Sequence, residues 1–119
     1  MKILNVGIIT KEEYKARTIA IAKGEYKLKK DEPKVWFESI KSMAQILSSE
    51  NQQLLKTILD NKPTSLKELE DLTGRAKSNL SRTLKTLERY GIVELHKENR
   101  NLVAEVKATQ FHIEFGIAA

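Results

Sequence analysis

The chain has 119 residues, which predicts one domain with one hydrophobic core. No window of the sequence approaches an apolar membrane span, and no membrane partner is expected. The absence of cysteine excludes disulfides and thiolate metal sites and is compatible with a reducing cytoplasm, where we expect the protein to act. The short apolar run in the first ten residues ends at Lys11, Glu12 and Glu13, so no signal peptide is expected.

The net charge of +5 is unevenly distributed along the chain. Residues 75–100 hold seven Lys or Arg against three Glu, whereas residues 48–74 hold three basic and five acidic residues. A basic cluster of this kind suits contact with nucleic-acid phosphates. Residues 1–47 also hold a basic excess, much of it in the Lys-rich stretch 27–34. That stretch fits a solvated linker as well as it fits contact with a DNA backbone.

A strand, a helix and a polar linker are predicted at the N-terminal end. Residues 2–9 are apolar and β-branched, which favours a short strand. Thr10 and Glu13 form a capping box, so a helix is expected over residues 11–23, ending at Gly24. The polar, Lys-rich residues that follow are expected to form the linker.

A second helix is predicted to begin at Asp31-Glu32-Pro33, because proline is tolerated in a first helical turn. Trp36 is expected to pack in the core, and a ligand or partner site at Trp36 and Phe37 is the alternative. The apolar residues recur at helical spacing, as Trp36, Ile40, Met43, Ala44 and Leu47.

Two further capping boxes, beginning at Ser49 and Ser65, predict the starts of two more helices. The first is expected to end at residues 61–63, where a proline follows, and the second is expected to span residues 66–73. The side chains expected on their inner faces are Leu54, Leu55, Ile58 and Leu59 in the first, and Leu66, Leu69 and Leu72 in the second.

Gly74 permits a tight turn into a longer helix, predicted over residues 76–90. A β-hairpin is expected over residues 92–107, with a charged, turn-rich tip. Apolar and polar residues alternate over residues 111–117, which predicts a last strand with one buried face. The inner face of the longer helix is expected to carry Leu80, Leu84 and Leu87.

The outer face of helix 76–90 carries side chains that hydrogen-bond to bases and phosphates. The N-terminal turns of a recognition helix enter the major groove, where Arg can bond to guanine and Asn to adenine. Lys85 and Arg89 lie further along the helix, so phosphate contact is expected there. The predicted DNA-binding residues are Arg75, Lys77, Ser78, Asn79, Ser81, Arg82, Lys85 and Arg89, together with Lys97 and Arg100 on the hairpin.

These patterns predict an α+β, mainly α fold. Residues 33–119 are expected to form a winged helix-turn-helix domain, with the hairpin over 92–107 as its wing. Residues 1–32 are expected to form an N-terminal helical extension that serves as a dimer or partner segment. We therefore expect a sequence-specific DNA-binding regulator. The alternative is a helix-turn-helix used for packing or protein contact, with a solvated basic face.

Three short segments carry a family resemblance: Leu72-Thr73-Gly74-Arg75, Ser78-Asn79-Leu80-Ser81-Arg82-Thr83-Leu84 and Tyr90-Gly91-Ile92-Val93. Through them, residues 35–107 resemble winged helix-turn-helix regulators of the MarR-like type. The chain looks most like a small prokaryotic group in which Trp36-Phe37-Glu38-Ser39 precedes Leu47-Ser48-Ser49-Glu50-Asn51. The resemblance implies a repressor that binds double-stranded DNA as a homodimer on a pseudo-palindromic operator. Some members of that group lie beside toxin genes, which implies an alternative: an antitoxin that neutralises a toxin partner and autoregulates its operon.

The C-terminal end departs from the MarR-like pattern. Typical MarR proteins have a long dimerisation helix after the wing, whereas residues 108–119 here are predicted to be a strand. We therefore expect the N-terminal segment, with the C-terminal strand, to form the dimer or partner surface.

No arrangement of residues for catalysis is evident in the sequence. His96 and His112 are far apart and lack the spacing of zinc ligands. The five glycines are scattered, so no phosphate-binding loop is predicted. We therefore expect no enzyme activity, no cofactor and no metal.

Overall fold

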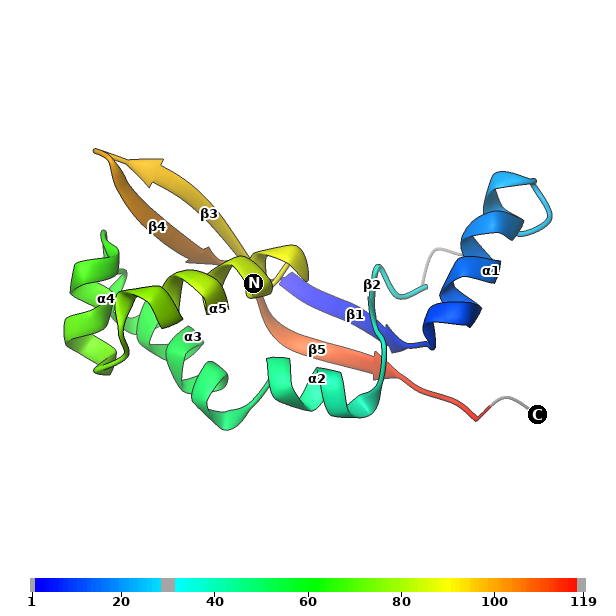
Figure 1. The fold of residues 1–119 in the computed structure, drawn as a ribbon, viewed down its shortest axis with the longest axis horizontal. Helices are drawn as coiled ribbons and strands as arrows, with labels where there is room; N and C mark the ends of the chain where they lie inside the picture. The colour runs from blue at the N-terminus through cyan, green and yellow to red at the C-terminus, as the bar shows by residue number, and fades with distance from the viewer. Residues whose placement is uncertain (1, 29–31, 118–119) are drawn as a thin grey trace.

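The computed structural model describes residues 2–28 and 32–117, which form an α+β fold elongated along one axis (Figure 1). Its principal extents are 49 × 27 × 25 Å. In the described ranges, no helix combines the length and the apolar character needed to cross a membrane. The elements are β1 (Lys2–Ile8), α1 (Lys11–Ala22), β2 (Val35–Phe37), α2 (Ile40–Ile46), α3 (Ser49–Asn61), α4 (Leu66–Thr73), α5 (Lys77–Arg89), β3 (Val93–Glu98), β4 (Asn101–Val106) and β5 (Ala108–Glu114).

A three-stranded parallel sheet joins the two ends of the described chain. β1 lies in its centre, with β2 on one side and β5 on the other. Val6 is in register with Val35 of β2 and with Ile113 of β5. The predicted strand at the N-terminal end is thus confirmed. It is the central strand of a sheet whose other two strands come from residues after the linker.

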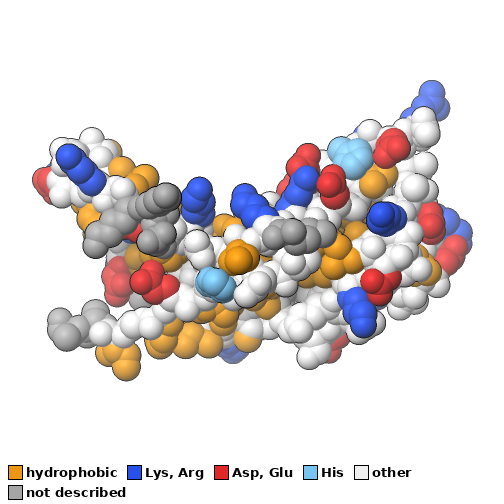
Figure 2. Space-filling view, turned by 180° about the vertical axis from the view of Figure 1, so that it is seen from behind, with side chains coloured by type: hydrophobic (Ala, Val, Ile, Leu, Met, Phe, Trp, Pro, Cys, Tyr) orange, Lys and Arg blue, Asp and Glu red, His pale blue; other side chains and the backbone are white. Residues whose placement is uncertain are grey.

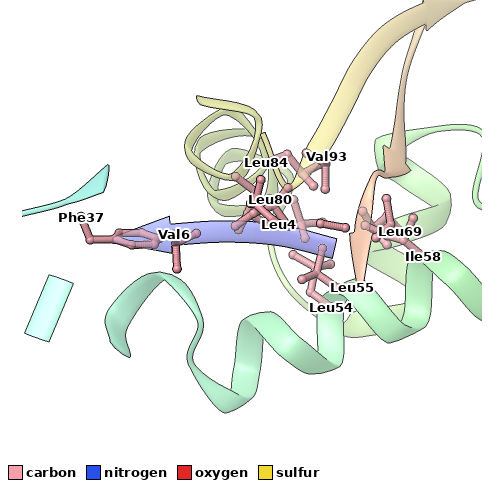
Figure 3. Packing of buried hydrophobic residues seen from close by; sticks show 14 residues of the cluster. Leu4, Val6, Phe37, Leu54, Leu55, Ile58, Leu69, Leu80, Leu84 and Val93 are labelled. Atoms are coloured by element: carbon pink, nitrogen blue, oxygen red, sulfur yellow. The ribbon is translucent and has the colours of Figure 1, made fainter. Parts of the chain in front are cut away.

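The hydrophobic core lies between this sheet and the helices (Figure 3). Leu4 and Val6 of β1 point into it, α3, α4 and α5 contribute Ile58 and most of its leucines, and the strands β2 to β5, with Ile92 just before β3, supply the rest of the cluster. Burial of each large aliphatic side chain stabilises the fold by roughly 1.5–3 kcal/mol. The buried cluster comprises Leu4, Val6, Phe37, Leu54, Leu55, Ile58, Leu69, Leu80, Leu84, Leu87, Ile92, Val93, Val106 and Ala108.

Helices α4 and α5 begin and end close to where the sequence predicts. The Ser65 hydroxyl accepts a hydrogen bond from the Glu68 backbone N–H (3.1 Å), which caps α4. Gly74 ends α4 with φ of 74°, a left-handed conformation that glycine adopts without steric cost. The predicted cap of α3 is wrong by one residue, because Ser48 rather than Ser49 accepts from the backbone, at Asn51.

The helix predicted from Asp31-Glu32-Pro33 is wrong where it can be compared. Asp31 itself lies outside the described residues. Residues 35–37 form β2, because their main chain pairs with β1. The helix begins only after Ser39, whose hydroxyl accepts from the Ser42 backbone N–H (3.0 Å). Trp36 does pack against its neighbours, since it faces Gly7 across the β1–β2 ladder.

Helix α1 projects at the end of the molecule opposite α4 (Figure 1). Its predicted N-terminal cap is confirmed, since Thr10 accepts from the Glu13 backbone N–H (3.2 Å). The helix has no buried residue. It is held by Arg17, which forms an ion pair with Glu32 (2.8 Å) and lies 4.9 Å from the centre of the Trp36 ring.

Two predictions of burial are wrong. Leu72 was expected on the inner face of α4, but it is 44% exposed because α3 and α5 cover the helix at Leu69 instead. The last strand was expected to have one buried face. β5 ends at Glu114, and Ile113 on its apolar face is 48% exposed because no described element covers the outer edge of the strand.

Candidate nucleic-acid interface

Helix α5 has two opposed faces, and the inner one anchors it. Leu80, Leu84 and Leu87 recur at spacings of four and three residues and are completely or almost completely buried. This spacing keeps all three on one side of a helix with 3.6 residues per turn. The outer face is therefore held in a fixed direction relative to the core.

The outer face carries a row of basic residues, which we name the α5 basic row: Arg82, Lys85 and Arg89. Ser78 precedes them on the same face, four residues before Arg82. All four residues are exposed. Their spacing of four, three and four residues places them opposite the buried leucines.

The charges of this row are not neutralised by neighbouring side chains. Among residues 2–28 and 32–117, no carboxylate lies within ion-pair distance of the α5 basic row or of Lys77. The helix contains one acidic residue, Glu88, and its carboxylate accepts a hydrogen bond from the Leu95 backbone N–H (3.1 Å). That bond ties α5 to β3 and turns the acidic group toward the hairpin.

Arg75 is placed differently from the other predicted DNA-binding residues. It is half-buried, and its guanidinium donates to Asn79 Oδ1 (3.1 Å) and to Asn51 Oδ1 on α3 (3.4 Å). Asn51 in turn donates to the Ile46 carbonyl (2.9 Å). Arg75 thus links the turn before α5 to α3, and Asn51 is a supporting residue that the sequence analysis did not identify.

We expect Arg75→Ala to lower the free energy of unfolding by about 1–3 kcal/mol, because it removes one charge-assisted hydrogen bond to Asn51 on α3 and one to Asn79 on α5. Urea denaturation of the two proteins measures the difference. Lys77→Ala is the matched control, since Lys77 is exposed two residues further along, and little change is expected. Equal stability of Arg75→Ala and the unaltered protein would contradict the linking role.

The β3–β4 hairpin carries two further cations near its tip. Asn99 and Arg100 form a two-residue turn with φ of 51° and 70°, the positive values that tight hairpin turns require. Lys97 and Arg100 are exposed. The hairpin runs from the end of α5 back toward the end of the molecule where α4 lies (Figure 1).

The base of the hairpin differs from its tip because its lysine is paired. Lys107 lies 3.2 Å from Glu105 and 3.5 Å from Glu94. The hydrogen bond to Glu105, with the attraction of both carboxylates, raises the pKa of Lys107 above its usual range. The free cations of the hairpin are therefore those at its tip.

Three further predicted DNA-binding residues lie on α5. Lys77 and Asn79 are exposed in its first turn, and Ser81 is half-buried.

Two other features of the sequence were considered as sites. In the Lys-rich stretch 27–34, residues 29–31 lie outside the described part of the chain. The two histidines are exposed, and no group of three or more His, Asp or Glu in the described ranges is arranged to hold a metal ion.

The family model HVO_A0114 matches residues 46–113, more than half of the chain. The chain belongs to the HVO_A0114 family. In this HVO_A0114 protein, the matched segment runs from the end of α2 into β5 and contains all ten predicted DNA-binding residues. The chain matches no curated protein.

Chemically, the α5 face of this HVO_A0114 protein can bind an extended polyanion. Guanidinium and ammonium groups bond to phosphate oxygens, and arginine can also donate two hydrogen bonds to a guanine edge. Thirteen residues of helix give a face about 20 Å long at 1.5 Å per residue. That length is enough for the face to contact several phosphates or bases.

Proposed function

We propose that this protein is a sequence-specific DNA-binding transcriptional regulator, acting as a repressor in the cytoplasm. In this proposal the segment from α4 to β4 is a winged helix-turn-helix. Helix α4 supports α5, and α5 enters the major groove of double-stranded DNA. The β3–β4 hairpin is the wing that contacts the backbone or minor groove. The protein acts as a homodimer on an operator with two half-sites.

The observation that carries the proposal is the α5 basic row, which faces away from the core without a carboxylate partner among the described residues. Three unpaired cations on a rigid helix attract phosphate and release counterions from DNA. A packing helix gains nothing from such a row, because like charges at this spacing repel one another. The hairpin adds Lys97 and Arg100 at its tip.

The first experiment is fluorescence anisotropy with a labelled fragment from the region upstream of the protein's own gene, compared with random DNA across a salt series. We expect selective binding to the upstream fragment and a steep fall in affinity as salt rises. Equal, weak binding to both fragments at all salt concentrations would overturn the proposal. It would favour the antitoxin alternative.

Two substitutions separate base contact from phosphate contact within the α5 basic row. Arg82→Ala is expected to weaken operator binding by about 1–3 kcal/mol and to relax the preference for one base pair. Lys85→Ala is expected to weaken all DNA alike and to reduce the salt slope by about one. The same anisotropy titrations measure both effects.

Lys15→Ala is the matched control for these two variants, because Lys15 is an exposed cation on α1, at the other end of the molecule. It should leave both affinities unchanged. If Arg82→Ala and Lys85→Ala lose the same affinity on operator and on random DNA, the assigned roles are wrong.

A further inference from the structure

β5 is an edge strand with little of the usual protection of an edge, since its one register shift lies at its start, beside Lys2 and Ile3 of β1. It pairs with β1 on one side, and its other side faces outward from the sheet. Exposed edges are commonly blocked by shortness, by Lys or by Pro. The opposite edge strand, β2, is only three residues long. β5 has seven residues, and the stretch 108–117 contains no Lys, Arg or Pro.

The same strand leaves apolar side chains uncovered. Phe111 and Ile113 lie on the face of the sheet that carries Leu4 and Val6, as the register with β1 shows. Beyond the strand, Phe115 is 54% exposed and Ile117 is 90% exposed. Figure 2 shows hydrophobic side chains gathered in a band along the lower edge of the molecule, on the half that carries the end of β5.

An open groove lies directly beside these side chains. It has a volume of about 520 Å³ and runs between α2, α3 and β5. The lining is mainly apolar. The groove residues include Met43 from α2, Leu47 directly after it, Leu55 and Leu59 from α3, and Phe111 and Ile113 from β5.

We propose that this edge is the homodimer interface, with β5 of one copy paired antiparallel to β5 of a second copy about a two-fold axis between Phe111 and Ile113. The two sheets then form one continuous six-stranded sheet. The segment from Phe115 to Ile117 of each copy covers the apolar groove of the other. A second copy fits because each chain carries both the strand and the groove, side by side. A two-fold interface uses the same surface on both copies, so each strand can reach the groove of the other copy.

The charge pattern of the strand also suits self-pairing. Glu114 is its only charged residue. A two-fold axis between Phe111 and Ile113 places His112 opposite its own copy and Glu114 opposite Gln110 of the second copy, so the two carboxylates do not face each other. The apolar residues Phe111, Ile113 and Phe115 of both copies share one face of the joined sheet, because antiparallel partners point the same way. This interface specifies the dimer on which the proposed function rests.

The test is the mass of the full-length protein in solution without DNA, by light scattering after size exclusion. The unaltered chain is expected at about twice 13.6 kDa. Phe115→Lys places a charge in the interface beyond the end of β5, where the fold does not depend on it. We expect it to raise the dimer dissociation constant roughly tenfold or more. A monomeric unaltered protein at micromolar concentration would overturn the proposal.

Ile19→Lys is the matched control, because Ile19 is an apolar residue of α1 with 46% exposure. It is expected to remain dimeric. A monomeric Ile19→Lys beside a dimeric Phe115→Lys would overturn the proposal and assign the interface to α1.

A cross-link gives a second measurement that does not depend on weakening the dimer. The chain has no cysteine, so single cysteines can be introduced one at a time from Gln110 to Glu114. In the proposed dimer, His112 lies at the two-fold axis and therefore opposite its own copy. We expect the two Cα atoms there to lie within the 4.4–6.8 Å that a disulfide spans. Mild oxidation is expected to give a covalent dimer there and none for Ile19→Cys. No covalent dimer at any of the five positions would overturn the interface.

These measurements separate the interface from the proposed function. A monomer that still binds its upstream DNA selectively would refute the interface and leave the DNA-binding function in place. A β5-linked dimer that binds no DNA selectively would refute the DNA-binding function and leave the interface in place. Arg82→Ala should remain dimeric in either case, since α5 is not part of the interface.

Discussion

Leu84→Ala is expected to lower the free energy of unfolding by about 2–5 kcal/mol. Leu84 is only 1% exposed and lies in the middle of the buried cluster, between Leu80 and Leu87 on the inner face of α5. The loss has two parts: the transfer of the side chain from water and the cavity left behind. Urea denaturation monitored by circular dichroism measures it.

Leu72→Ala makes the same chemical change at an exposed position of α4. Leu72 is 44% exposed, so we expect a much smaller loss, on the order of 1 kcal/mol or less. A destabilisation by Leu84→Ala no greater than that of Leu72→Ala would contradict the packing of α5 against the sheet. A well-folded Leu84→Ala protein should also bind DNA less tightly, because the α5 basic row would lose its fixed direction.

Gly7→Val is expected to be the second strongly destabilising change, with a loss of about 1–3 kcal/mol or more. A Cβ atom at Gly7 would lie 2.3 Å from Cζ3 of Trp36 and 3.0 Å from Cγ of Pro33. The backbone of Gly7 does not have a positive φ, so the cost is steric. The Trp36 ring would have to leave its place over β1, and thermal or urea denaturation measures the consequence.

Gly116→Val is the matched control for the steric cost within one copy, measured at a concentration where the protein is monomeric, because a Cβ atom at Gly116 meets no atom of its own chain within 4 Å. It should leave stability within about 0.5 kcal/mol of the unaltered protein. Trp36→Ala removes the clash, so the double variant Gly7→Val, Trp36→Ala should lose less than the sum of the two single variants. An additive double variant would show that Trp36 is not the obstacle.

Local signals predict the elements around the candidate site well. Ser65 and Gly74 mark the ends of α4 through bonds within a few residues, and three leucines at helical spacing fix the inner face of α5. The outer position of Arg82 and Lys85 follows from helix geometry alone. For these residues the sequence carries enough information, because each feature depends on neighbours within one or two turns.

The errors arise where a distant partner decides the structure. Trp36 belongs to a helical pattern of apolar residues, but its strand is set by β1, about thirty residues earlier, and β-structure depends strongly on such context. Arg75 stays a predicted DNA-binding residue, but its hydrogen bond to Asn51 on α3 was not predicted. Nothing in the residues next to Arg75 indicates that contact.

The pairing of β1 with β5 also governs how this protein reaches its fold. Helices α3, α4 and α5 and the hairpin join residues that are near one another in sequence, so they can form early. The parallel sheet closes a loop of about 100 residues, and such non-local contacts slow folding because chain entropy is lost before the contact is gained. Until β5 is in place, Leu4 and Val6 lack part of their cover, and one edge of β1 is open. The pairing of β5 with β1 therefore completes the fold, and we expect the rate of folding to depend on how fast the two ends of the described chain meet.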